Sequence, residues 1–196
     1  MPSTIAVFGG SFDPPGEHHR VIAAEIAMHF DDIVIVPSGP RPDKPRTWPI
    51  DPQHRAIMMS MAFRDIPNLA FDFSDLTEEC FTRTFDLDTR FKDRGERWHV
   101  VGSDLVEGGR RQESQVHSWY RGREIWYNFN IAVVARPGYP LDAADLPPRS
   151  RIFGCSRQAS SSDIRRRITA GQSITGLVNP QVEEFIKQRH LYGARS

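Results

Sequence analysis

Two short segments, near the start and near the end of the 196-residue chain, carry residue types suited to binding phosphate. The first follows an apolar run at residues 4–8 and contains Gly9 and Gly10, then SFDPPG, and then His18 and His19. Glycines let a backbone approach a ligand closely, and the free N–H groups at the start of a helix favour a bound anion. Histidines in the first helical turn add donors that can take on charge. This segment therefore predicts a nucleotide site.

The second segment reads ASSSDIR from Ala159 to Arg165 and is followed by two more arginines. Serines followed by an acidic residue predict the N-terminus of a helix. The hydroxyls, the free N–H groups and the guanidinium of Arg165 would then face one anion, because arginine bonds phosphate oxygens through two N–H groups at once. The alternative is a capped surface helix with a charged face.

Together the two segments resemble the HxGH-type nucleotidyltransferases, and within them the bacterial nicotinate-nucleotide adenylyltransferases. The first segment follows that family's motif GG(S/T)FDPxHxGH in GGSFDPP and in His19, and the second follows ISSTxIR with Ser162 in place of threonine. The resemblance implies that both segments bind ATP. The nucleotide-binding residues that it assigns in them are Gly9, Gly10, Ser11, Phe12, Ser161, Ser162 and Ile164.

The chain departs from the first motif at two positions. Gly16 stands where the family has its first histidine, and His18 stands where it has glycine. The family is expected to place both histidines on the ATP phosphates, so losing the first removes a contact that is typically on the order of 2–4 kcal/mol. Either His18 replaces that histidine from the next turn, or its bulk shifts the bound base.

Weaker matches lie between the two segments. PSGPRPDKPR resembles the family's PxxxPxHK loop, which places Lys44 on a phosphate; the alternative is a solvated lysine. GSD at residues 102–104 resembles GxD, in which Asp104 would bond a ribose; alternatively Asp104 caps a helix. HRAIM at residues 54–58 resembles the family's HRxxM helix, for which a structural role is favoured.

The acceptor side of the resemblance rests on three residues. Thr84 and Asp86 match the family's YTxDT segment, with Arg83 in place of tyrosine. Trp119 falls where the family has a tryptophan that stacks on a pyridine ring, as an electron-rich indole face favours. The alternative for Trp119 is packing in the core.

The elements that must position these residues alternate along the chain. Strands are expected at 4–8, 33–37, 69–73, 98–102, 130–135 and 151–154, and helices at 18–30, 52–64 and within 177–192. This alternation predicts an α/β fold with a Rossmann-like doubly wound parallel sheet and a helical C-terminal end. We expect one nucleotidyltransferase domain over residues 1–196. In such sheets ligands bind beyond the carboxyl ends of the strands, where the first segment would lie.

Composition narrows the choice of partners. Lys and Arg together number 25, as do Asp and Glu, so the net charge favours neither nucleic acid nor an anionic membrane as partner. The chain has no apolar run of roughly 20 residues and no signal peptide, which predicts a cytoplasmic protein. Its two cysteines form no CxxC pair. The sequence carries no signal for an oligomeric state.

The resemblance implies adenylyl transfer from ATP to nicotinate or nicotinamide mononucleotide, with release of pyrophosphate and with Mg²⁺ bound to the ATP. The residues that it assigns to catalysis are His19, Lys44 and Arg165, and His18 joins them if it replaces the motif's first histidine. Two alternatives remain open: a relative with another phosphorylated acceptor, such as phosphopantetheine or a sugar phosphate, and a catalytically impaired nucleotide-binding protein.

Overall fold

A parallel sheet lies at the centre of the computed structural model, which describes residues 3–41, 50–135, 138, 141–155, 157 and 159–194. Within these residues the sheet has six strands in the order β3-β2-β1-β4-β5-β6, and each neighbouring pair is parallel. The strands are β1 (Thr4–Gly10), β2 (Asp32–Pro37), β3 (Leu69–Phe71), β4 (Glu96–Gly102), β5 (Asn130–Ala135) and β6 (Ser150–Gly154). All six were predicted from their apolar runs.

The strand order identifies the place where a ligand can bind. The chain adds strands on one side of β1 as far as β3 and then crosses back to lay β4 against the other side of β1. The order therefore reverses between β1 and β4, and at such a switch point the loops separate and leave a crevice. Gly10 and Gly102 end the two strands there. The predicted Rossmann-like doubly wound sheet is confirmed.

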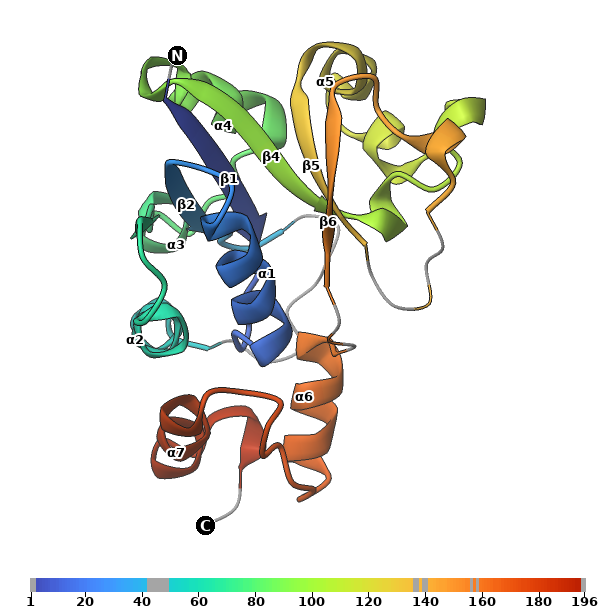
Figure 1. The fold of residues 1–196 in the computed structure, drawn as a ribbon. Helices are drawn as coiled ribbons and strands as arrows, with labels where there is room; N and C mark the ends of the chain where they lie inside the picture. Colours follow the sequence, from blue (N-terminus) through green and yellow to red (C-terminus); the bar gives the residue numbers. More distant parts are fainter. Residues whose placement is uncertain are drawn as a thin grey trace.

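Helices cover both faces of the sheet (Figure 1). They are α1 (Glu17–Ala27), α2 (Pro52–Phe63), α3 (Ser74–Thr77), α4 (Thr84–Arg90), α5 (Gly122–Asn128), α6 (Ser161–Thr169) and α7 (Pro180–Gln188). Short 3₁₀ helices occur at Lys92–Arg94, Ser103–Leu105, Gly109–Arg111, Gln115–Ser118, Ala143–Asp145 and Leu191–Gly193.

The alternation of side chains along β1 divides the core between the two faces. Ala6 and Phe8 point into the large cluster that contains Ile22 of α1, whereas Ile5 and Val7 point into a cluster closed by α4. Successive residues of a strand face opposite sides, so a strand covered on both sides reads as an unbroken apolar run. The apolar run at residues 4–8 therefore follows from burial on both faces.

Helix boundaries follow local capping. Pro52 opens α2 behind Asp51, whose carboxylate accepts a hydrogen bond from the Gln53 N–H at 2.7 Å. Helix α1 ends at Ala27, three residues before the predicted limit, because the Met28 N–H turns back to the Glu25 carbonyl in a tighter final turn. The apolar Met28 side chain is consequently exposed.

The C-terminal segment packs against the turn that follows β1. Figure 1 shows α6 and α7 together below the sheet. The Glu17 N–H donates to the Leu177 carbonyl at 2.8 Å, and the buried Tyr192 hydroxyl donates to the Asp13 carboxylate at 2.5 Å. Burial, together with the nearby Asp13 charge, raises the pKa of Tyr192 well above its usual value, so the phenol keeps its proton.

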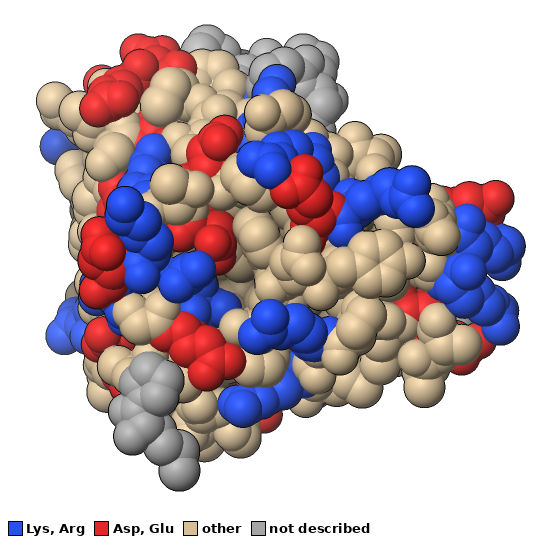
Figure 2. Space-filling view, turned by 90° about the horizontal axis from the view of Figure 1, so that it is seen from above, with Lys and Arg blue, Asp and Glu red and all other residues tan. Residues whose placement is uncertain are grey.

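The surface has no strong bias of charge on the face seen in Figure 2, where acidic and basic side chains are interspersed. This agrees with the equal numbers of acidic and basic residues in the sequence. Among the described residues, no helix has the length and apolar content needed to cross a bilayer.

The Tyr192 hydrogen bond is expected to contribute to stability. We predict that Tyr192→Phe lowers the free energy of unfolding by about 1–3 kcal/mol, because the buried bond to a carboxylate is lost. Urea denaturation measures this. Tyr127→Phe is the matched control, since Tyr127 is 46% exposed where Tyr192 is 1% exposed. Equal losses in the two variants would contradict the assignment.

Candidate active site

A pocket of about 360 Å³ lies at the carboxyl ends of β1 and β4, at the switch point of the sheet. Side chains and backbone from both predicted phosphate-binding segments line it. The predicted site residues among its lining are Gly9, Gly10, Ser11, Phe12, His18, His19, Ser161, Ser162 and Arg165. Segments about 150 residues apart in the sequence therefore form one site, as an active site that binds a single triphosphate requires.

Hydrogen bonds hold the start of α6 against the turn after β1. The Ser161 hydroxyl donates to the Pro14 carbonyl at 2.9 Å. The Arg165 guanidinium donates to the Asp13 carbonyl and, at 3.2 Å, to the Ser162 hydroxyl. These bonds orient the N-terminus of α6 and a cation toward the same pocket, and both features favour an anion.

The predicted helix start of the second segment is confirmed in detail. The Ser160 hydroxyl accepts a hydrogen bond from the Asp163 N–H at 3.1 Å, which makes Ser160 the N-cap of α6. The N–H groups of the first turn have no partner within the helix itself. Ser160, Ser161 and Ser162 line the pocket at this helix start.

His19 has a defined tautomer. Its Nδ1 accepts a hydrogen bond from the Gly16 N–H at 3.1 Å, as the third residue of a helix does in a capping box. The neutral ring therefore carries its proton on Nε2, which makes Nε2 the donor of the imidazole. The ring packs against Phe12, with 4.8 Å between centroids, and against His18, with 3.8 Å. His19 thus presents a donor from a fixed orientation.

Two predicted nucleotide-binding residues serve mainly as packing groups. The Phe12 side chain is buried between Phe8 and Phe63, although it forms part of the pocket's inner wall. A Cβ on Gly10 would lie only 3.0 Å from the Phe12 ring, so a side chain there would need the ring to shift slightly. Ile164 is fully buried in the main core and does not line the pocket, because it lies on the inward face of α6. The prediction that Ile164 lies at the nucleotide stays a prediction, and its side chain contributes to the core.

Two arginines of the pocket were not predicted as site residues. Arg55 of α2 is 3% exposed, and one terminal nitrogen of its guanidinium donates to the Ser11 carbonyl and, at 2.9 Å, to the Ser38 carbonyl. It joins the loops that follow β1 and β2. Arg41, whose guanidinium lies 5.3 Å from the Phe81 ring centroid, also lines the pocket. The HRxxM match placed Arg55 in a structural helix, but only the fold shows that this helix points at the site.

A second, smaller cavity of about 70 Å³ adjoins the first. It shares Gly9, Gly10 and Arg41 with the larger pocket and extends to Thr82 and to Leu87 of α4. The bare glycine backbone therefore separates two spaces, one facing α6 and the other facing α4.

Buried polar groups shape the wall of the smaller cavity. The Asp75 carboxylate accepts bonds from the N–H and the hydroxyl of Thr82, both at 2.6 Å, and from Arg90 at 2.9 Å. A buried carboxylate bonded on both oxygens keeps a fixed position. The loop that carries Thr82 into α4 is held in place by these bonds.

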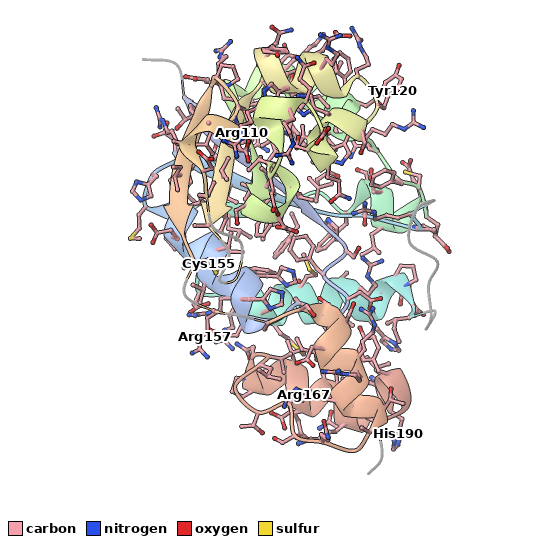
Figure 3. The ribbon with its side chains drawn as sticks, turned by 90° about the vertical axis from the view of Figure 1, so that its right-hand side faces the viewer. Arg110, Tyr120, Cys155, Arg157, Arg167 and His190 are labelled. Atoms are coloured by element: carbon pink, nitrogen blue, oxygen red, sulfur yellow. The ribbon has the colours of Figure 1, made fainter. Side chains whose placement is uncertain are left out.

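The predicted acceptor residues lie in two segments that contact each other. The Arg83 guanidinium lies 4.7 Å from the Tyr120 ring centroid, and Arg121 lies 3.7 Å from that of Phe85. In Figure 3 Tyr120 is near the upper end of the molecule and Arg167 of α6 is toward the lower end. The acceptor segments are thus placed away from α6.

Thr84 begins α4, Asp86 is exposed, and Trp119 is half-buried against a small apolar cluster. The packing alternative for Trp119 accounts for its buried side. None of the three lines the larger pocket.

Two further predicted residues complete the comparison with the sequence. Asp104 follows β4 within the 3₁₀ helix Ser103–Leu105, and its neighbours Gly102 and Leu105 line the pocket. The N-cap of that helix is Gly102, so the capping alternative for Asp104 is wrong. Lys44 lies outside the described residues.

Comparison with known proteins agrees with this geometry. Residues 7–167 match a family model described as cytidylyltransferase-like. A probable nicotinate-nucleotide adenylyltransferase of Frankia alni is 34% identical over 199 residues, covering 96% of this chain and 100% of the relative. The nicotinate-nucleotide adenylyltransferase of Bacillus subtilis is 27% identical over 199 residues, covering 96% and 97%.

The fold is also that of a solved structure. The Plasmodium falciparum nicotinic acid mononucleotide adenylyltransferase complexed with NaAD superposes with a TM-score of 0.80 at 21% identity, covering 98% of both chains. A switch-point pocket in a sheet of this order is the arrangement of Rossmann-like nucleotidyltransferases. The chain belongs to the cytidylyltransferase-like family and, within it, to the nicotinate-nucleotide adenylyltransferases. The resemblance carried by the two motifs is confirmed.

Arg55 is expected to hold the pocket's loops together. We predict that Arg55→Met lowers the free energy of unfolding by roughly 1.5–3 kcal/mol and weakens binding of a non-hydrolysable ATP analogue, because the Ser11 and Ser38 carbonyls lose a charged donor. Urea denaturation and calorimetric titration measure the two effects. Arg64→Met is the matched control, since exposed Arg64, the C-cap of the same helix, bonds only the surface residue Gln181 among the contacts described. An unchanged analogue affinity in Arg55→Met would remove this residue from the site.

Proposed function

We propose that this protein transfers the adenylyl group of ATP to nicotinate mononucleotide, or to nicotinamide mononucleotide, forming deamido-NAD or NAD and pyrophosphate. The observation that carries the proposal is the single pocket lined by both phosphate-binding segments at the switch point. The names of the relatives support the same reaction. One domain of residues 1–196 would hold both substrates, in the cytoplasm as the sequence predicts.

The reaction needs no nucleophile from the protein. An oxygen of the mononucleotide phosphate attacks the α-phosphorus of ATP in line, and a new O–P bond forms. The bond from the α-phosphorus to the oxygen that bridges it to the β-phosphorus breaks, and pyrophosphate leaves with that electron pair. Catalysis then consists of positioning the reactants and stabilising charge on the phosphoryl oxygens.

Different residues of the larger pocket would position the reactants and stabilise the charge. The backbone of Gly9, Gly10 and Ser11 would approach the phosphates closely, and the Nε2 donor of His19 would bond the transferring group. Arg165 and the start of α6, with Ser161 and Ser162, would hold the departing pyrophosphate. These are oriented dipoles and charges that need little rearrangement as negative charge develops.

The smaller cavity supports a place for the acceptor. It meets the larger pocket at Gly9 and Gly10, so a phosphate entering from the side of α4 would reach the α-phosphorus across the glycine backbone. We propose that the pyridine ring lies toward Thr84, Asp86 and Trp119, and that Asp104 bonds a ribose. Lys44 would add charge at the phosphates. The Arg83 guanidinium favours the carboxylate of nicotinate over an amide.

Mg²⁺ would enter the site on ATP. The described residues contain no cluster of three or more His, Cys, Asp or Glu side chains arranged to hold a metal ion. The donors present fit an ion whose ligands are phosphate oxygens and water, as Mg²⁺ commonly prefers with nucleotides. When bound, the ion would supply positive charge to the triphosphate.

The acceptor is tested by direct assay. With Mg-ATP and, in turn, nicotinate mononucleotide, nicotinamide mononucleotide and phosphopantetheine, we expect pyrophosphate release with a pyridine mononucleotide, and faster release with the nicotinate form. Release only with phosphopantetheine would establish another acceptor. ATP binding without release for any acceptor would establish an impaired nucleotide-binding protein.

His19 is tested by two variants that separate its capping bond from its donor. We predict that His19→Ala and His19→Gln each lower turnover by at least about tenfold, because Nε2 is lost. Only His19→Ala should also lower the melting temperature, since glutamine at this helical position can still accept the Gly16 N–H bond. His29→Ala, which removes a half-exposed histidine just beyond the end of α1, is the control. Unchanged kinetics in both His19 variants would exclude His19 from the mechanism.

A further inference from the structure

The space beside Gly16 is filled by another residue's ring. A Cβ built on Gly16 would lie 2.5 Å from both Cε1 and Nδ1 of His18, and 2.9 Å from Cδ1 of Ile164. Real Cβ atoms do not approach carbon or nitrogen atoms so closely. Residue 16 can therefore carry no side chain while the His18 ring stays in place.

Helix geometry explains why the ring is there. His18 is the second residue of α1, and Gly16 is its N-cap. Side chains of a helix lean toward its N-terminus, so the side chain of residue 18 covers the first turn and the cap. Ile164 of α6 closes the other side of the same space. The ring thus stands where a side chain from position 16 would begin.

The ring is part of the pocket wall and not an obstruction within it. His18 is 3% exposed yet lines the larger pocket, and its ring lies 3.8 Å from that of His19 between centroids. A side chain that blocked the nucleotide would project into the open volume and would be exposed. Two imidazoles therefore stand side by side where α1 meets the phosphate-binding backbone.

We propose that Gly16 and His18 act as a coupled pair: His18 brings the pocket's second imidazole to the ATP phosphates from the space of residue 16, and glycine at 16 is what admits it. The proposal rests on the proposed function for the identity of the reaction. The sequence left two alternatives for GEHH: His18 replaces the motif's first histidine, or its bulk shifts the bound base. The proposal selects the first. In this assignment His18 is a catalytic residue, and Gly16 positions it.

A double-mutant cycle tests the coupling. Gly16→Ala and His18→Ala should each lower turnover by roughly tenfold or more, the first by displacing the ring and the second by removing it. Gly16→Ala should cause little further loss in the His18→Ala background, because no ring remains to be displaced and only the terminal Cδ1 of Ile164, 2.9 Å from the new Cβ, must still shift. Losses that multiply in the double variant would overturn the proposal, as would full activity in His18→Ala.

A reciprocal exchange tests the position of the imidazole. His18→Gly should lose activity, and Gly16→His should lose it through the clash with His18. The double variant G16H/H18G should recover several-fold over His18→Gly, because an imidazole then enters from residue 16 into vacated space. No recovery in a double variant that melts as the wild type does would overturn the proposal.

A binding readout separates this proposal from the proposed function. Affinity for a non-hydrolysable ATP analogue, measured by calorimetry for all these variants, should follow the same non-additive pattern and needs no acceptor. If pyrophosphate is released with none of the acceptors, the proposed function is wrong. The double-mutant cycle measured by analogue affinity still tests whether Gly16 and His18 are coupled. His29→Ala, which changes a histidine outside the site, should match the wild type. If His18→Ala does not fold, His18→Asn takes its place in the cycle.

Discussion

The pocket depends on the hydrogen bonds between the start of α6 and the turn that follows β1. Ser161 and Arg165 bond the carbonyls of Pro14 and Asp13, and Tyr192 bonds the Asp13 carboxylate from the C-terminal side. Neither segment alone surrounds a triphosphate. Because the bonds go to backbone carbonyls of one turn, they bring the N-terminus of α6 to a defined place beside the glycines of β1. The parallel sheet supplies the crevice, and this junction closes it.

The same turn also shows how the glycine backbone that lines the pocket is held in position. Gly9 and Gly10 contribute no side chains, so their position is maintained by neighbours: the Phe12 ring below them and Arg55, which joins the loops after β1 and β2. A transfer reaction without a protein nucleophile depends on such preorganisation, since its charges and dipoles must already point at the phosphoryl oxygens. Residues that do not contact the phosphates therefore affect the site, because they hold the phosphate-binding residues in position.

Much of the fold followed from the sequence, and less of the site did. Apolar runs predicted all six strands, and β1, β2 and β5 are apolar in a row because both of their faces are buried. The Ser160 cap marked the start of α6. The motif placed Ile164 at the nucleotide but could not show that its side chain lies on the inward face of α6 and packs in the core. The match at Arg55 favoured a structural role, which its bonds to two loop carbonyls support, but it could not show that α2 brings this residue to the pocket, because the direction of a helix is a property of packing. The sequence also allowed Asp104 to cap a helix, but the N-cap of the 3₁₀ helix there is Gly102.

The sequence by itself determined the strand–helix alternation, the two phosphate-binding segments and, through their resemblance, the family, because these depend on residue type and local spacing. Only the tertiary structure decided that the segments share one pocket and that the acceptor residues lie toward α4, away from α6. It also placed the His18 ring in the space beside Gly16, which is the observation behind the proposal for GEHH. The four letters allow His18 either to replace the missing histidine or to obstruct the nucleotide, and the choice depends on a distance of a few ångströms between the ring and the space beside Gly16. The lean of side chains toward the start of a helix brings the ring to that space, and Ile164 of α6 closes its other side, which only the tertiary structure shows.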